Sequence, residues 1–293
     1  MTREAGPQPA GRDVAVDDRT YHVIELGDEG PPTVFLHGGG PGCSAWTDFG
    51  PVAPMFSADR RCVFVDLLQY GASDKQPISG PRWTFLATSL RDLLDELGLD
   101  GPVDVVCNSW GGTIAVRFAA LFPDRLRALV VTGSMPVFYG PLAPLPEGAR
   151  RGRNARDAYY GGEGPTREKM RHLIASLEWY DPNLIPESTI DRRYEQSLQP
   201  GEVELAGHSD ELRGDWEDLE DSLRAIAAPT LFAWGMYDAF LTPDYPLMLA
   251  RMVPHGQLFV MDRVSHHLQE ERPAAYHGVV DAWLRVQDRE TDS

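Results

Sequence analysis

The sequence predicts an α/β fold in which a mainly parallel, doubly wound sheet carries an inserted helical cap. Short apolar runs alternate with helix-like stretches, which is the pattern of a parallel sheet covered on both faces. This alternation stops in the middle of the chain and resumes later, as expected when a helical segment interrupts a sheet domain. A length of 293 residues fits one sheet domain with such an insertion.

The apolar runs define the expected strands. We expect strands at Tyr21–Leu26, Thr33–His37, Cys62–Asp66, Val103–Cys107, Ala128–Thr132, Thr230–Trp234 and Gln257–Met261. A helix is expected at Leu86–Leu97, where leucines recur at helical spacing, and another at Gly111–Phe122, which stops before Pro123. Asp281–Val286 is expected to lie in a final helix.

The cap is expected to divide the sheet domain in two. We place the first part of the core at residues 19–135, the cap at 136–224 and the second part of the core at 225–288. The middle stretch is rich in Arg, Glu, Pro, Gly, Tyr and Trp. It has helical segments near Thr166–Leu177 and Pro186–Ser197 but no convincing strand, and the strand pattern resumes at Thr230.

The composition restricts the partners of this chain. There are 27 basic and 44 acidic residues, a formal charge of −17, which disfavours nucleic acid and anionic membranes as partners. An anionic small-molecule substrate would therefore need a nearby cation. The three cysteines, Cys43, Cys62 and Cys107, form neither a disulfide framework nor a zinc spacing, and no apolar signal or membrane segment is visible. A cytoplasmic location is expected.

Ser109 stands between an expected strand and an expected helix. This is the setting of a nucleophile elbow, in which a serine on a strained turn projects its hydroxyl above the sheet. Gly111 is the small residue that lets the strand and helix approach, whereas Cys107 stands where the G-x-S-x-G pattern has its first glycine. The alternative interpretation is a serine at an ordinary helix N-cap.

A glycine-rich turn, His37–Gly42, follows the run Thr33–Leu36. Such a turn can direct backbone N–H groups into a pocket without side chains in the way. The N–H of Gly39, with Gly40 as the alternative, is expected to join that of Trp110 in an oxyanion hole.

Asp238 and His266 each follow a late expected strand. The chain order Ser109, Asp238, His266 is the order of a Ser–Asp–His triad in the α/β-hydrolase fold. An aspartate in a loop can also be a solvated turn residue, and His267 competes with His266 as the base. Two adjacent histidines can suggest a metal, but no partner cluster is nearby in the sequence, so neither a metal nor a cofactor is expected.

These motifs resemble those of the meta-cleavage-product hydrolases, which are C–C bond hydrolases of aromatic-ring and steroid-ring degradation. The resemblance runs from about Thr33 to Leu284 and includes the elbow Asn108–Gly112. The other matching segments are His37–Gly42, Ala45–Phe49, Asp66–Asp74, Val116–Arg125, Tyr180–Ile185, Arg193–Glu195 and His266–Glu271.

The resemblance implies a substrate with a carboxylate beside a 2-hydroxy-dienoate and a ketone four carbons further along. It implies that Arg193 and Asn108 hold the carboxylate end, that Gly40, Asp48 and His267 line the substrate site, and that a homo-oligomer is among the expected states. Four residues depart from the family pattern: Cys107 and Gln69 replace glycines, Asp48 replaces Asn, and His267 replaces Trp.

Two other functions remain open from the sequence. One is an ester, lactone or amide hydrolase similar to the proline iminopeptidases, which have a comparable glycine-rich loop and a Ser-Trp-Gly elbow. The other is a ligand-binding member of the fold without catalysis, although such a protein would not need the three residues of the triad.

Overall fold

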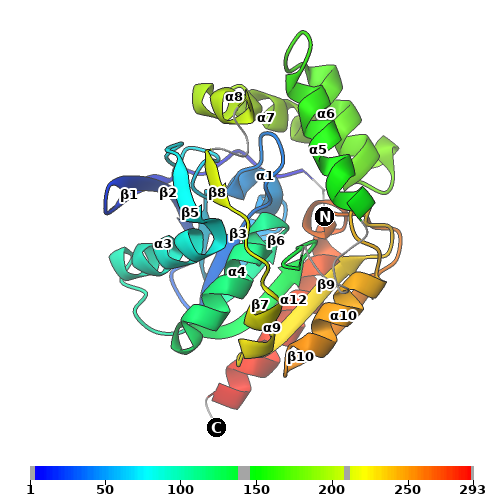
Figure 1. The fold of residues 1–293 in the computed structure, drawn as a ribbon. Helices are drawn as coiled ribbons and strands as arrows, with labels where there is room; N and C mark the ends of the chain where they lie inside the picture. Colours follow the sequence, from blue (N-terminus) through cyan, green and yellow to red (C-terminus); the bar gives the residue numbers. More distant parts are fainter. Residues whose placement is uncertain (1–3, 138–145, 208–211, 292–293) are drawn as a thin grey trace.

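The computed structural model describes residues 4–137, 146–207 and 212–291. Within these residues the main sheet has eight strands in the order β1-β2-β4-β3-β6-β7-β9-β10. Figure 1 shows helices on both faces of this sheet and a further group of helices beyond one of its ends. The strands are β1 (Arg12–Val16), β2 (Arg19–Leu26), β3 (Pro32–Leu36), β4 (Arg61–Val65), β6 (Val103–Asn108), β7 (Leu126–Thr132), β9 (Thr230–Gly235) and β10 (Gly256–Met261).

The expected fold class is confirmed. Strands β4, β3, β6, β7, β9 and β10 pair in parallel, while β2 pairs antiparallel with both β1 and β4. The seven expected strands correspond to every strand of this sheet except β1. The β1 segment escaped prediction because it is only five residues long and buries only Val14 and Val16, after the exposed and charged Arg12 and Asp13.

Side chains of each strand alternate between two cores. Val34 and Leu36 of β3 face one core, which α3 (Arg82–Glu96), α4 (Trp110–Leu121), α9 (Glu220–Ala225) and α10 (Asp244–Met252) cover. Phe35 faces the other, beneath α1 (Ala45–Phe49), α2 (Ala53–Phe56) and α12 (Pro273–Thr291). Because of this two-residue alternation both faces of the sheet are buried, which explains why most strand sequences are almost continuously apolar.

The middle of the chain is mainly helical, as expected. It contains α5 (Pro146–Tyr160), α6 (Arg167–Leu173), a π-helical turn η2 (Ile174–Glu178), η3 (Pro182–Leu184), α7 (Glu187–Ser197) and α8 (Pro200–Gly207). α5, α6, η2 and α7 share a small core of their own, which includes Tyr159, Met170, Ile174, Trp179 and Ile190. The limits of the cap at 136 and 224 stay a prediction.

The expectation that this stretch holds no strand is wrong at one place. β8 (Arg213–Asp215) pairs in parallel with β5 (Ile78–Pro81), which was also not predicted. Both are short and carry Gly, Pro or charged residues, so they lack the apolar alternation by which strands are detected.

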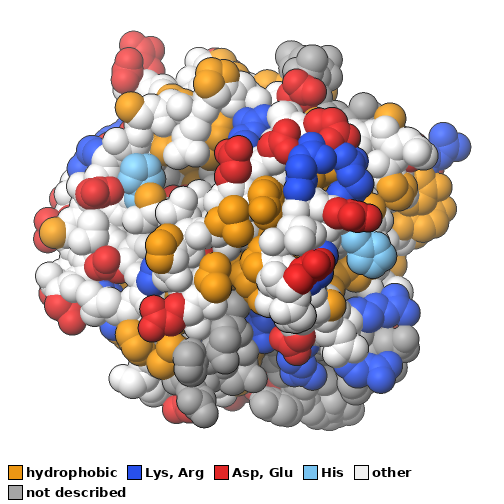
Figure 2. All heavy atoms as spheres, turned by 90° about the horizontal axis from the view of Figure 1, so that it is seen from above, with side chains coloured by type: hydrophobic (Ala, Val, Ile, Leu, Met, Phe, Trp, Pro, Cys, Tyr) orange, Lys and Arg blue, Asp and Glu red, His pale blue; other side chains and the backbone are white. Residues whose placement is uncertain are grey.

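The surface carries charged and hydrophobic side chains together. Seen from above the view of Figure 1, acidic and basic side chains are interspersed with hydrophobic ones and do not form one block of like charge (Figure 2). Within the described ranges, no helix has the length and apolar character needed to cross a membrane.

Candidate active site

Ser109 occupies the turn between β6 and α4 in a conformation that is rare for a residue with a side chain. Its backbone has φ 50° and ψ −112°. Its N–H donates to the carbonyl of Thr132 at 2.7 Å, which holds the turn against the end of β7. Strained backbone of this kind persists only where the surroundings enforce it, and it is the geometry of a nucleophile elbow.

The residues on either side of Ser109 explain why the elbow needs small side chains. A Cβ atom on Gly111 would lie 2.2 Å from the carbonyl oxygen of Leu36, so only glycine fits between α4 and β3. Cys107 is fully buried, and its thiol contacts the carbonyl of Val130 at 3.0 Å. A cysteine therefore fits the position where the sequence pattern has its first glycine.

The glycine-rich turn lies directly beside the elbow. Leu36 of β3 pairs with Cys107 of β6, so the residues that follow each strand emerge side by side. His37 fixes the turn: its Nδ1 donates to the carbonyl of Gly38 at 2.7 Å, and its Nε2 accepts from the N–H of Leu67 at 2.9 Å. A Cβ on Gly39 would come within 2.5 Å of the Trp110 ring.

The backbone donors expected for an oxyanion hole are free of internal partners. Among the described residues, none accepts a hydrogen bond from the N–H groups of Gly39, Gly40 or Trp110. The N–H of Gly38, in contrast, donates to Asp48 at 2.8 Å. The structure thus leaves Gly39 and Gly40 both available as the partner of Trp110.

Asp238 and His266 form a buried pair at the ends of the neighbouring parallel strands β9 and β10. Nδ1 of His266 lies 2.9 Å from Oδ2 of Asp238, and each residue is only 5% exposed. The other carboxylate oxygen of Asp238 accepts from the N–H groups of Phe240 and Leu241. It is His266, and not His267, that the structure pairs with Asp238, which leaves Nε2 of His266 for a substrate or nucleophile.

His266 also lies next to the elbow, although the two side chains are not bonded. A Cβ on Gly133 would come within 2.5 Å of the His266 ring and 3.2 Å of Oδ1 of Asn108, the residue before Ser109. Across the described residues, no hydrogen bond joins Ser109 to His266. Such bonds are often long in free enzymes and shorten when substrate binds.

Two glutamates hold the His266 loop against the helical middle segment: Glu271, from the matching segment His266–Glu271, and Glu178, which no motif identified. The backbone carbonyl of Glu178 accepts from the N–H groups of both His266 and His267 at 3.2 Å. The carboxylate of Glu271 accepts from the N–H of Ser265 at 2.6 Å and from that of Tyr180 at 2.8 Å. The π-helical turn that ends at Glu178 thus docks on the loop that carries His266.

Arg193 lies in a closed ion pair with Glu178. Nη1 and Nη2 donate to the two carboxylate oxygens of Glu178 at 2.9 and 3.0 Å, and Nε donates to the carbonyl of Pro41 at 3.0 Å. Arg193 is 0% and Glu178 4% exposed. Burial alone raises the pKa of Glu178, but Arg193 and His267 together lower it below its ordinary value, so the pair is ionised.

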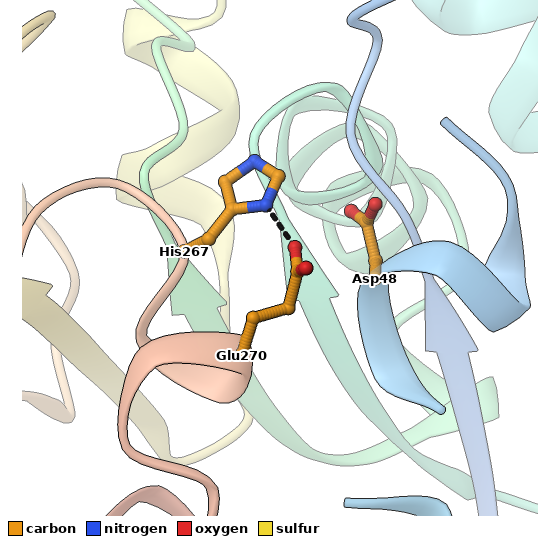
Figure 3. Close-up of side chains that lie close together, drawn as sticks. All are labelled: Asp48, His267 and Glu270. Carbon is orange, nitrogen blue, oxygen red and sulfur yellow. Dashed lines mark hydrogen bonds and ion pairs between the residues drawn. The ribbon is translucent and has the colours of Figure 1, made fainter. Parts of the chain in front are cut away.

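His267, Glu270 and Asp48 lie close together beside this ion pair, with His267 pointing towards Glu270 (Figure 3). Nδ1 of His267 is hydrogen-bonded to Glu270, and its Nε2 lies 4.0 Å from Glu178. Burial alone lowers the pKa of His267, but Glu178 and Glu270 raise it to about 9. His267 is therefore a cation at neutral pH.

Asp48 connects the network to the elbow. It accepts from Nδ2 of Asn108 at 3.3 Å as well as from the N–H of Gly38. Burial raises its pKa, yet His267 and His37 lower it below the ordinary value, so Asp48 is an anion. The ligand-type atoms of Asp48, His267 and Glu270 all lie within 4.8 Å of one another. Together with Glu178 and Arg193, His267 and Glu270 form a continuous set of buried ion pairs and hydrogen bonds.

The structure therefore gathers the residues expected to line the substrate site. Gly40 packs against Arg193, with an added Cβ only 3.1 Å from Nη2. The carboxylate of Glu178 contacts both Arg193 and His267, and the carboxylate of Asp48 accepts a hydrogen bond from Asn108. Glu270 belongs to the same network and lies in the matching segment His266–Glu271, where the sequence gave it no role. No motif identified Glu178, because its partners come from other elements of the fold.

Comparison with known proteins agrees with this architecture. Residues 31–273 match the family model described as alpha/beta hydrolase fold. The chain is 30% identical over 264 residues to a 2-hydroxy-6-oxo-2,4-heptadienoate hydrolase of Pseudomonas putida, covering 88% of this chain and 91% of the relative. It is also 30% identical over 264 residues to a 2-hydroxymuconate semialdehyde hydrolase of Pseudomonas sp. strain CF600, with 88% of each chain covered.

A solved structure gives the same result. The 2-hydroxy-6-oxo-6-phenylhexa-2,4-dienoate hydrolase of Rhodococcus sp. strain RHA1 superposes with a TM-score of 0.77 at 25% identity, covering 94% of this chain and 98% of the other. The fold, the matched length and these relatives lead to one conclusion. The chain is a hydrolase that belongs to the α/β-hydrolase family and, within it, resembles the meta-cleavage-product hydrolases.

Proposed function

We propose that this protein uses Ser109, Asp238 and His266 to hydrolyse a C–C bond beside a ketone, in a substrate of the 2-hydroxy-6-oxo-dienoate type. The observation that carries the mechanism is the buried Asp238–His266 pair beside a strained Ser109. The substrate type rests on similarity, over about nine-tenths of the chain, to hydrolases named for such compounds.

The geometry supports a stepwise reaction. After the dienol has become a ketone, Ser109 adds to the distal carbonyl carbon while His266 takes its proton and Asp238 stabilises the imidazolium. The N–H groups of Trp110 and Gly39 or Gly40 stabilise the resulting oxyanion. The C–C bond then breaks, its electron pair enters a delocalised dienolate, and His266 returns the proton to that half.

Water completes the reaction. It attacks the acyl group on Ser109, again with His266 as the base, and releases a carboxylic acid. One ketone and one water thus give one carboxylic acid and one dienol, with no redox change and no further reactant.

An ester or lactone hydrolase is the second candidate. The observation that favours it is the closed Arg193–Glu178 pair, because an ester needs the triad and the oxyanion donors but no cation for a remote carboxylate. The expectation that Arg193 binds a substrate carboxylate is not part of the proposed function, since a carboxylate of the protein already holds that position.

A small substrate panel tests the proposal. The purified enzyme is given a 2-hydroxy-6-oxo-dienoate, a p-nitrophenyl ester and a prolyl amide, and the products are identified by mass spectrometry. Cleavage of the dienoate into an acid and a dienol, absent in Ser109→Ala, is the expected result. Rapid hydrolysis of the ester with no C–C cleavage of the dienoate would favour the second candidate.

A further inference from the structure

Arg193 has no bidentate face left for a second carboxylate. A guanidinium can grip a carboxylate end-on through its two Nη atoms or side-on through Nε and one Nη. Glu178 fills the end-on position, and the Pro41 carbonyl takes Nε at 3.0 Å, which blocks the side-on position. A substrate carboxylate could bind there only by displacing Glu178.

The surrounding charges oppose that exchange. Asp48 is a second buried anion near Arg193, and Glu270 is a third buried carboxyl group bonded to His267. Glu178, Asp48 and Glu270 make three acidic groups, whereas the described part of the network contains two cations, Arg193 and His267. A further carboxylate would add negative charge to a site that already holds as many anions as it can neutralise, and in a buried site that costs binding energy.

Space is restricted as well. The carboxylate of Glu178 and the guanidinium of Arg193 both pack closely against the glycine-rich turn. A Cβ on Gly40 would lie 3.3 Å from Oε1 of Glu178 and 3.1 Å from Nη2 of Arg193. The carboxylate is also constrained by its own backbone, since the Glu178 carbonyl holds the His266 loop. The backbone at Glu178 is therefore fixed, and a substrate carboxylate would have to turn the Glu178 side chain out of its ion pair with Arg193.

We propose that Glu178 serves as an internal substitute for a substrate carboxylate, and that the natural substrate is uncharged at the end that lies towards Arg193. An amide, ketone or ester group fits this description. Glu178 is then a specificity-determining residue that selects against carboxylates. This inference rests on the proposed C–C hydrolysis and narrows its substrate to a neutral relative of the dienoates.

The test uses two substrates that differ in one group. A 2-hydroxy-6-oxo-dienoate and its C1 carboxamide have nearly the same shape but differ by one negative charge. We expect kcat/KM of the wild type for the carboxamide to exceed that for the acid by at least about 10-fold, because the acid must face Glu178 and Asp48. An equal or greater kcat/KM for the acid would overturn the inference.

Glu178→Gln keeps the size of the side chain but removes the internal carboxylate. In this variant the ratio of acid to carboxamide turnover should rise by about 100-fold, since Arg193 then has an unpaired charge for the substrate. Glu195→Gln, an exposed carboxylate on the same helix as Arg193, is the matched control and should leave the ratio unchanged. A ratio that is unaltered in Glu178→Gln would contradict the role of Glu178.

A competition assay separates this inference from the proposed function and does not depend on the variant. Wild-type hydrolysis of a p-nitrophenyl ester is inhibited with 2-oxopentanoate or 2-oxopentanamide. The amide should inhibit at least about 10-fold more tightly than the acid if the site excludes carboxylates. Stronger inhibition by the acid would overturn the inference, whereas failure to cleave both dienoid compounds would overturn the C–C proposal alone.

Discussion

Nδ1 of His266 lies 2.9 Å from Oδ2 of Asp238, at the ends of the adjacent parallel strands β10 and β9. The same aspartate also accepts two backbone N–H bonds through Oδ1, so its orientation is fixed from both sides. This arrangement keeps the proton of a neutral imidazole on Nδ1 and turns Nε2 towards the substrate side.

Asp238→Asn should remove that control without disturbing the loop. The Asn oxygen can still accept from Phe240 and Leu241, but its amide would donate to Nδ1 and so place the imidazole proton on Nε2. We expect kcat for any substrate to fall about 10⁴-fold, with a thermal midpoint close to that of the wild type. A variant that retains more than a tenth of the wild-type kcat would show that Asp238 is not the triad acid.

Ser109→Ala should abolish covalent chemistry. Because members of a triad act as a unit, kcat should fall at least about 10³-fold. Labelling with a fluorophosphonate, followed by peptide mass spectrometry, should place the adduct on Ser109 in the wild type and find none in the variant. Ser79→Ala, which changes an exposed serine in β5, is the control and should keep both activity and label. An adduct elsewhere would contradict the assignment.

Gly111→Ala should damage the fold at the elbow. The new Cβ would lie 2.2 Å from the carbonyl oxygen of Leu36, so β3 and α4 must move apart. We expect a loss of about 2–4 kcal/mol in the free energy of unfolding, measured by urea denaturation, together with loss of activity. Gly278→Ala, in α12 with nothing within 4 Å of the new Cβ, should instead stabilise the protein by about 0.5–1 kcal/mol. Equal effects of the two substitutions would contradict the close packing at the elbow.

Glu202 should make stability depend on pH. Its carboxylate accepts from the N–H groups of Gly42 and Gly71, and burial raises its pKa from 4.5 to about 7. Since the folded state holds this proton more tightly than the unfolded state, the free energy of unfolding should decline as pH rises from about 4.5 to about 7. The contribution of this group is at most about 3 kcal/mol.

Glu202→Gln should remove that part of the pH dependence. Urea unfolding curves at pH 5 and pH 8 should differ less in the variant than in the wild type, while Glu168→Gln, an exposed carboxylate in α6, should behave like the wild type. An unchanged pH dependence in Glu202→Gln would show that this carboxyl group titrates normally.

The sequence predicted the sheet well, and it indicated positions for a triad, because both leave local signals. Each of the seven expected strands is an apolar run, and Ser109, Asp238 and His266 follow such runs directly. β1, β5 and β8 left no such signal, because these strands are only three to five residues long and each includes charged, Gly or Pro residues.

The charged network could not be predicted, because its members come from segments that only the fold brings together. The resemblance placed Asp48 and His267 at one substrate site but gave no sign that they interact with Glu270. In the structure the ligand-type atoms of all three side chains lie within 4.8 Å of one another. Glu178 has no motif and reaches Arg193 from a different helix. Pairwise contacts of this kind are invisible in a single sequence.

Gln69 is another residue whose contacts could not be predicted from the sequence. It has φ 73°, the conformation that favours glycine, so its presence in the turn looks unfavourable. Its side-chain amide donates to the carbonyls of Gln76 and Leu212, bonds that a glycine could not make. These two hydrogen bonds offset some of the backbone strain of the turn, and they are visible only in the folded chain.

The most direct measurement of the central claim is an isotope experiment on C–C cleavage. The wild type and Ser109→Ala are incubated in H₂¹⁸O with a 2-hydroxy-6-oxo-dienoate and with its C1 carboxamide, and the products are analysed by mass spectrometry. The account predicts that the wild type releases an ¹⁸O-labelled carboxylic acid and a dienol, faster from the carboxamide, and that Ser109→Ala releases neither. Recovery of both compounds intact from a wild-type enzyme that rapidly hydrolyses p-nitrophenyl esters would contradict it.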